Sequence, residues 1–202
     1  MPNILLVAPS FNGKTSILRR FLDNHPPSQD PAGEVTICPV LFVESPPGPN
    51  IGALYIEILD KLQVPYKTTA GVPEKLSQIL KLFKLMDVRI LILDEIHHLI
   101  SGSVARQQEY RNALKSLGNA AQICIVAAGT EDAHHAFSTD PQMRSRFPTE
   151  ELPKWGATTE FGGILATLEQ RTPLRLPSNL KDPKMMMAIH LRMSFILLKN
   201  FF

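Results

Sequence analysis

The chain has 202 residues, of which 44% are hydrophobic and 20% are charged, and its formal net charge is +2. This composition is typical of a globular protein with a sizeable core and excludes extensive disorder. The small charge does not by itself imply a nucleic-acid partner. Two cysteines, Cys38 and Cys124, are too few for a disulfide framework and favour a reduced, intracellular setting. No apolar run reaches the roughly 18 residues of a membrane span, and the N-terminus lacks a basic leader, so we expect no membrane partner.

Short apolar runs alternate with amphipathic and proline-rich stretches. Four runs are short enough for strands buried on both faces, and a fifth, shorter strand is expected near residue 150. In chain order, the predicted strands span residues 4–8, 39–43, 89–93, 122–127 and 149–152. Helical spacing of apolar residues falls between them. The predicted helices cover 15–22, 54–62, 76–83 and 110–117, the last ending near Gly118, and the predicted loops are 24–37 and 45–50.

Strands that alternate with helices predict a parallel sheet with helices on both faces. We therefore expect residues 1–153 to form a three-layer α/β/α core around five parallel strands. Beyond this point the pattern weakens. Residues 161–168 predict one helix, three prolines interrupt the stretch after it, and the final apolar stretch has no clear amphipathic order. Residues 154–202 are expected to form a smaller second part that is partly helical and ends in an irregular C-terminal tail.

The segment APSFNGKT, residues 8–15, lies directly between a predicted strand and a predicted helix. Its last three residues match the phosphate-loop pattern G-x-x-x-x-G-K-[ST], whereas Ala8 stands where the first glycine usually lies. In this pattern backbone N–H groups surround phosphate oxygens, the lysine supplies a positive charge, and the threonine hydroxyl binds Mg²⁺. A chance turn that caps a helix is the alternative, and the strand–loop–helix context favours the phosphate site. The expected nucleotide-binding residues are Pro9, Ser10, Phe11, Asn12, Gly13, Lys14, Thr15 and Ser16.

The third predicted strand ends in two adjacent carboxylates, Asp94 and Glu95. A carboxylate at the carboxyl edge of a parallel strand faces the crevice in which ligands bind. We expect Asp94 to hold Mg²⁺ together with Thr15, and Glu95 to orient and deprotonate the attacking water. A solvated strand-to-helix turn is the alternative, and the phosphate loop upstream favours the catalytic interpretation.

Three further side chains are candidates for contact with the transferred phosphate. Thr130 follows the fourth predicted strand, which is expected between the two strands that carry the motifs. Its hydroxyl would bind the attacking water or the phosphate, or would cap the following helix, and the two roles are compatible. Arg146 is the first candidate for an arginine finger that acts on a neighbouring subunit, and Arg144 is the second. A salt bridge or a solvated helix end is the alternative for both.

Two histidine doublets, residues 97–98 and 134–135, lack the i, i+4 spacing of a helical zinc site. We expect them to pack in the protein or to couple the acidic pair to a subunit interface, and we do not expect them to bind a metal.

These segments together resemble the AAA+ ATPases, and more closely the TniB-type transposition ATPases, relatives of TnsC and the IstB-like helper proteins. The resemblance covers about residues 1–183. It rests on MPNILLVAPSFNGKT, RILILDEIHHLISGS, QQEYRNALKSLGN, ICIVAAGTEDAHHAFSTDPQMRSRF and LPKW. It implies a bacterial, cytoplasmic ATPase that uses ATP and Mg²⁺, assembles as a homo-oligomer on target DNA and directs or activates a DDE transposase.

Each site residue acquires a family role from this resemblance. Lys14 and Thr15 are implied to be the phosphate and Mg²⁺ residues, and Asp94 with Glu95 the Walker B pair. Thr130 is the implied sensor-1 residue and Arg146 the implied finger.

The ends of the chain depart from the family pattern. Relatives carry a segment before the phosphate-loop strand and continue into a helical lid. Here the chain starts at that strand and ends in MMMAIHLRMSFILLKNFF, which implies truncation at both ends and an incomplete lid. A helicase loader of the IstB/DnaC type, a low-turnover nucleotide-dependent adaptor and an inactive remnant stay open as alternatives. Non-specific contact with the DNA backbone would come from basic side chains. The candidates are Arg171, Arg175, Lys181, Lys184, Arg192 and Lys199.

Overall fold

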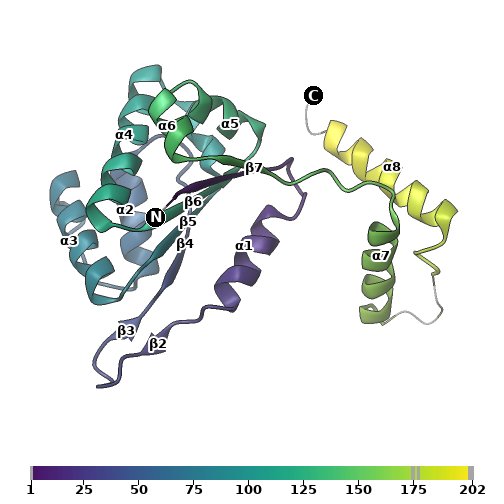
Figure 1. Cartoon of the computed structure of the whole chain (residues 1–202), viewed down its shortest axis with the longest axis horizontal. Helices are drawn as coiled ribbons and strands as arrows, with labels where there is room; N and C mark the ends of the chain where they lie inside the picture. Colours follow the sequence, from purple (N-terminus) through teal and green to yellow (C-terminus); the bar gives the residue numbers. More distant parts are fainter. Residues whose placement is uncertain (1, 174–175, 177, 200–202) are drawn as a thin grey trace. The chain divides into compact units, whose positions relative to one another are not determined.

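The computed structural model describes residues 2–173, 176 and 178–199, and within them the side chains up to Leu191 (Figure 1). It divides into two compact units, Met1–Leu152 and Pro153–Phe202. Among the described residues, no helix is both long enough and apolar enough to cross a membrane. Of the basic residues expected to contact DNA, Arg175 and the side chains of Arg192 and Lys199 lie outside what the structure describes.

The first unit is built on a five-stranded sheet in which every pairing is parallel. Its order is β4-β5-β6-β1-β7. The strands are β1 (Ile4–Val7), β4 (Val40–Glu44), β5 (Ile90–Asp94), β6 (Cys124–Gly129) and β7 (Thr149–Glu151). The predicted parallel five-stranded sheet is therefore confirmed. As expected, β6 lies between the strand before the phosphate loop and the strand that ends in the acidic pair.

Helices cover both faces of this sheet (Figure 1). Those of the first unit are α1 (Lys14–Asp23), α2 (Ile51–Lys61), α3 (Val72–Leu85), η1 (Ile96–Ser101), α4 (Val104–Ala121), α5 (Glu131–Ser138) and α6 (Pro141–Arg146). Successive side chains of a strand point to opposite faces of the sheet, so a continuous apolar run supplies apolar side chains to the cores on both faces. Thus Leu91 and Leu93 join the large core beneath α2 to α6, whereas Ile92 packs with Leu18 of α1.

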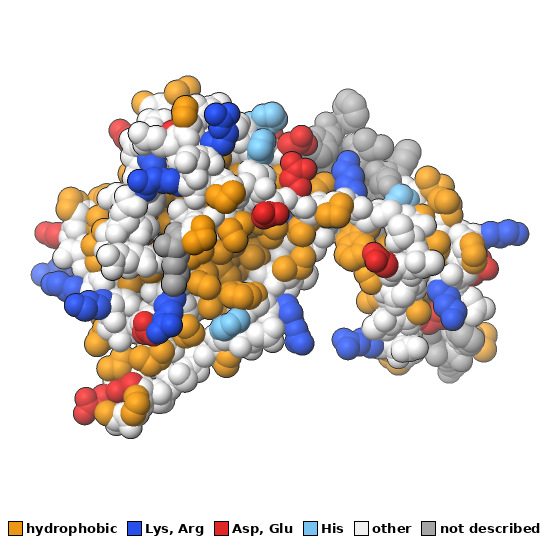
Figure 2. Space-filling view, in the orientation of Figure 1, with side chains coloured by type: hydrophobic (Ala, Val, Ile, Leu, Met, Phe, Trp, Pro, Cys, Tyr) orange, Lys and Arg blue, Asp and Glu red, His pale blue; other side chains and the backbone are white. Residues whose placement is uncertain are grey.

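The face of the sheet that carries α1 holds the smaller core. Leu18 packs there against three fully buried strand residues. Hydrophobic side chains remain visible around α1 and the neighbouring strands (Figure 2). The half-buried ones are Leu6, Leu22, Phe42, Ile90 and Val126. This helix therefore covers its face of the sheet only in part.

Two local predictions for the first unit are wrong. The stretch 24–37, expected to be a loop, contains a short antiparallel pair, β2 (Ser28–Gln29) and β3 (Thr36–Ile37). Asp30 stabilises its turn, because Oδ1 accepts the backbone N–H groups of Glu34 and Val35. In addition, α4 does not end near Gly118 but continues to Ala121. A Cβ at Gly118 would lie 3.2 Å from Cδ1 of Ile125, so this glycine serves close packing against β6.

The second unit consists of α7 (Thr159–Arg171) and α8 (Pro183–Lys199). The helix predicted over 161–168 lies within α7, but the expectation of irregular structure beyond it is wrong over α8. Pro183 stands in the first turn of α8, where a missing N–H does no harm. The rings of Phe161 and His190 lie 5.9 Å apart, and His190 Nε2 is 2.8 Å from the carbonyl of Trp155. These contacts join α8 to α7 and to the segment that precedes it.

Candidate functional site

The phosphate loop connects the carboxyl end of β1 to the first turn of α1, as expected. Gly13 precedes the helix in a left-handed conformation, with φ of 91°. Nothing lies within 4 Å of a Cβ built there, so its backbone angle, and not a lack of space, requires glycine. Phe11 is also left-handed, with φ of 59°, and its side chain is 79% exposed. Left-handed residues of this kind allow successive backbone N–H groups to line an anion-binding concavity.

Lys14 is buried inside this loop. Its Nζ donates to the carbonyls of Ala8 at 2.8 Å and Pro9 at 3.0 Å. An ammonium group has three N–H donors, so two carbonyls leave one donor for an anion. Burial lowers the pKa of Lys14, while the carboxylates of Glu95 and Asp94 oppose this shift. The positive charge therefore lies between the loop and the acidic pair.

Thr15 and Asp94 join the two motifs across 79 residues of sequence. The Thr15 hydroxyl donates to Oδ2 of Asp94 at 2.6 Å, and Asp94 is almost fully buried at the end of β5. A hydroxyl and a carboxylate oxygen are the ligand types that Mg²⁺ prefers, and Mg²⁺ commonly completes its shell with phosphate oxygens and water. The donor set thus fits Mg²⁺. Within the described part of the chain, no group of three or more His, Cys, Asp or Glu side chains is arranged to hold a metal.

Glu95 turns the chain from β5 into η1. It has φ of 55°, and its N–H donates to Oδ1 of Asp94 at 2.9 Å. The left-handed turn gives the two adjacent carboxylates different partners. Asp94 contacts Thr15, whereas Oε2 of Glu95 lies 3.1 Å from Nδ1 of His97. One carboxylate is therefore available for a metal while the other is held apart from it.

Thr130 directly follows β6 and occupies the N-cap position of α5. Its carbonyl accepts the N–H of Ala133, but its side chain makes no cap hydrogen bond. Oγ1 is buried and has no hydrogen-bond partner among the residues that the structure describes. A buried hydroxyl without a partner is costly. Of the two roles considered for this side chain, contact with a bound phosphate or water is therefore the one the geometry leaves open.

Arg146 is not brought to this cluster. It ends α6, and its Nη1 donates to Oδ1 of Asn119, in the last turn of α4, at 2.8 Å. Both residues precede strands, so they lie at the amino edge of the sheet, whereas the phosphate loop leaves the carboxyl edge. Arg144, in the same helix, is likewise exposed. The structure thus gathers the phosphate loop, Asp94, Glu95 and the end of β6, and leaves both arginines outside.

Two contacts of the residues near or predicted for the site were not expected from the sequence. His97 was expected to pack or to couple the acidic pair to an interface, but its specific partner, Glu95, was not anticipated. The only sequence signal was their separation of two residues at the end of a strand. The contact of Asn119 with Arg146 had no local signal at all, because 27 residues separate the two.

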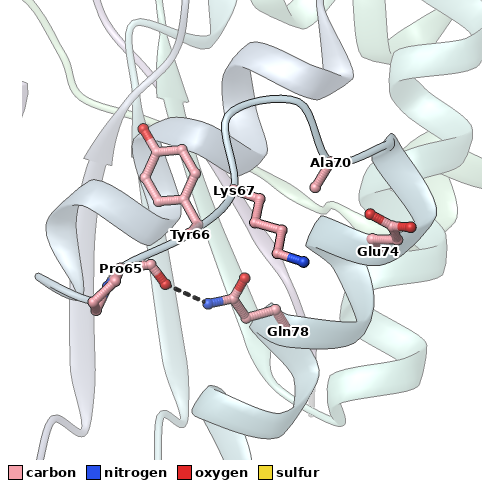
Figure 3. Close-up of a pocket in the computed structure, with 6 residues that line it drawn as sticks. All are labelled: Pro65, Tyr66, Lys67, Ala70, Glu74 and Gln78. Atoms are coloured by element: carbon pink, nitrogen blue, oxygen red, sulfur yellow. Dashed lines mark hydrogen bonds between the residues drawn. The ribbon is translucent and has the colours of Figure 1, made fainter.

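A pocket lies elsewhere on the first unit, between the α2–α3 connection and α3 (Figure 3). None of the predicted site residues lines it. Gln78 Nε2 donates to the carbonyl of Pro65 at 2.9 Å, and Lys75 Nζ donates to the carbonyls of Thr68 and Ala70. These bonds hold the connection between the two helices, so the polar groups here have a structural role.

Comparison with known proteins places the chain in a family. The family model described as "Bacterial TniB protein" matches residues 1–157. The chain belongs to the TniB family. No curated protein matches this TniB-family chain. The resemblance stated from the sequence motifs is thereby confirmed.

Solved structures agree on the fold. The TniB-family chain is similar to the ORC2 protein of Aeropyrum pernix, with 18% identity and a TM-score of 0.66 over 89% of this chain and 48% of that one. It is also similar to CDC6P from Pyrobaculum aerophilum, with 17% identity and a TM-score of 0.56 over 98% of this chain and 56% of that one. It is similar as well to a Walker-type ATPase of Pyrococcus abyssi, with 17% identity and a TM-score of 0.60 over 98% of this chain and 69% of that one. The fold is that of the P-loop AAA+ ATPases, and the chain spans about half the length of the first two relatives.

Proposed function

We propose that this TniB-family chain binds ATP with Mg²⁺ and hydrolyses it. The observation that carries the proposal is the contact of 2.6 Å between Thr15 and Asp94, with the Lys14 ammonium held in the adjoining loop. A hydroxyl, a buried carboxylate and a buried cation at the start of a helix are the groups that a magnesium triphosphate requires.

Each group would have a distinct task during hydrolysis. Lys14 would neutralise charge on the β- and γ-phosphates, and Thr15 with Asp94 would hold Mg²⁺, which withdraws charge from the phosphate oxygens when bound. The Glu95 carboxylate would accept a proton from the attacking water. The buried hydroxyl of Thr130 would donate to that water or to the γ-phosphate and so help to place it.

We further propose that the active form is an assembly of several copies. Arg146 lies at the opposite edge of the sheet from the phosphate loop of its own subunit, so it would serve the site of a neighbour. A guanidinium group supplied in this way stabilises charge on the transferred phosphoryl group. A γ-phosphate contacted by two subunits would then make assembly depend on the nucleotide.

DNA and a transposase are the partners that the proposal assigns to the assembly. TniB-family membership supports a role in transposition, in which ATP-bound copies assemble on target DNA and direct or activate a DDE transposase. A structural relative, the ORC1 protein of Aeropyrum pernix, is described in complex with DNA. We propose that contact here is to the phosphate backbone and independent of base sequence.

Steady-state ATP turnover and nucleotide binding test this function together. The 202-residue chain is compared with Lys14→Ala and Glu95→Gln, with and without double-stranded DNA. Lys14→Ala is expected to lose nucleotide binding, because no other cation lies in the loop to replace it. Glu95→Gln is expected to bind nucleotide normally and to lose turnover by about 100-fold or more, because an amide does not accept the proton. The same turnover in wild type and both variants would refute the proposal.

A further inference from the structure

The contact between His97 and Glu95 has no role in the function proposed so far. We propose that His97 is a positioning residue, which holds one oxygen of the Glu95 carboxylate so that the other faces the attacking water. The inference rests on the proposed function, because it concerns the same hydrolysis site.

The two side chains are close and partly shielded from solvent. Nδ1 of His97 lies 3.1 Å from Oε2 of Glu95, and the side chains are 24% and 35% exposed. Within the described part of the chain, this buried nitrogen has no hydrogen bond of regular geometry, so the carboxylate is its electrostatic partner. The separation of 3.1 Å is within the range of an N–H···O hydrogen bond, which the pair would form if the ring N–H and the carboxylate oxygen were aligned.

The imidazole is held firmly enough to act as a support. The His97 backbone nitrogen packs against β6, where a Cβ on Gly129 would approach it to 3.2 Å. The preceding residue, Ile96, is fully buried. The ring itself lies against that of His98, with centroids 4.7 Å apart. These contacts hold the backbone at His97 and one side of its ring, so the ring can restrain the long and otherwise flexible glutamate side chain.

Burial of His97 favours a neutral ring, and a neutral ring suits this role. Burial lowers the pKa of His97, the Glu95 carboxylate opposes the shift, His98 and Lys14 lower it further, and Asp132 opposes it. A protonated imidazole would pair with Glu95 as a cation and make it a weaker base. A neutral imidazole with its proton on Nδ1 would donate to Oε2 and would leave the second oxygen of the carboxylate to accept a proton from water.

The neighbouring histidine supplies a matched control. His98 has the same chemistry and the next position in the chain, but its Nδ1 lies 3.4 Å from the carbonyl of Ser45. It therefore faces the residue that follows β4. The substitution His98→Leu keeps an apolar side chain against the His97 ring. An effect of the Glu95 contact should therefore appear on removal of the His97 imidazole and not of the His98 imidazole.

The test compares His97→Leu, His97→Asn and His98→Leu in the full chain, with ATP and Mg²⁺. Leucine removes the donor, whereas the asparagine amide places an N–H near the former Nδ1. We expect His97→Leu to lower kcat by about 10- to 100-fold, since misplacing a reacting group by about 1 Å costs on this scale. KM and the Kd for nucleotide are expected to change by less than about threefold, because the base acts only in the chemical step. His97→Asn is expected to recover most of the lost kcat, and His98→Leu to resemble wild type.

Two kinds of result would overturn the inference. Wild-type kcat in His97→Leu would show that the contact does not position the base. Equal losses in His97→Leu and His98→Leu, or a loss of nucleotide binding together with a lowered Tm, would show a role in folding only. In both cases a Glu95→Gln variant that binds ATP without turnover would leave the proposed function standing. If Glu95→Gln itself turned over normally, the proposed function would fail instead.

Discussion

Removal of the Arg146 guanidinium tests whether two copies of this chain share one hydrolysis site. Arg146 lies at the amino edge of the sheet, while the phosphate loop starts at the carboxyl edge, after β1. The four residues of this strand span about 13 Å at the rise of an extended chain. The arginine side chain is also directed toward Asn119 at its own edge. A role in hydrolysis therefore requires a neighbouring subunit.

The structure predicts very different effects of Arg146→Ala on stability and on turnover. The substitution removes one hydrogen bond of 2.8 Å between two exposed side chains, so the free energy of unfolding should fall by less than about 1 kcal/mol. In a unit of this size that corresponds to a decrease in Tm of only about 2–4 °C. A missing arginine finger lowers kcat by about 10³- to 10⁵-fold. If Arg146 is the finger, Arg146→Ala will lower kcat strongly and will change Tm only slightly.

Mixing of two inactive variants provides the assay. Arg146→Ala retains Glu95, and Glu95→Gln retains Arg146. In such an assembly each interface takes the hydrolysis site from one subunit and the arginine from the next. In a random one-to-one mixture, half of the sites and half of the arginines are intact, so about one quarter of the interfaces contain both. Turnover should return to about that fraction of wild type at assembling concentrations. Arg144→Ala, in the same exposed helix, is the matched control and should keep its turnover.

Full turnover by Arg146→Ala alone would refute the assignment of the finger. A mixture that stays inactive while the proteins co-assemble would refute action between subunits. If Arg144→Ala lost turnover while Arg146→Ala kept it, the role of the finger would pass to Arg144.

Two further substitutions test the packing of each unit. Gly129→Ala should destabilise the protein by about 1–3 kcal/mol, because the added methyl would lie 2.8 Å from a side-chain carbon of α5. Urea unfolding measures this effect, and Gly163→Ala is the control because nothing lies within 4 Å of a Cβ at Gly163. An unchanged unfolding midpoint for Gly129→Ala would contradict the close approach of β6 to α5. Glu169→Gln should make the connection before α8 more sensitive to proteases, because the carboxylate accepts the N–H groups of residues 178–180. The backbone N–H groups of these residues, that of Leu180 foremost, lower the pKa of Glu169. The wild-type protein should therefore lose the same protection against proteases as the pH falls below the ordinary glutamate pKa of about 4.3. Equal resistance of wild type and Glu169→Gln near neutral pH would argue against the contact.

Local features of the sequence were enough to predict the fold class and the type of site. The run ILIL of β5 predicts a strand buried on both faces, because its side chains alternate between two layers of helices. The segment from Gly13 to Thr15 predicts a phosphate loop, because only certain residues suit a left-handed turn before a helix that must receive an anion. Both signals lie within a few residues of sequence, where backbone angles and periodicity are set.

The tertiary structure decided everything that depends on residues far apart in the chain. The order of the strands brings Thr15 to Asp94, and it leaves Arg146 at the other edge of the same sheet. Gly118 looked like a helix end and proved to be a place where α4 approaches Ile125. Spacing along the sequence reports which face of an element is apolar, but it does not report which element will cover that face. The partners of each polar group are settled only when the elements pack together.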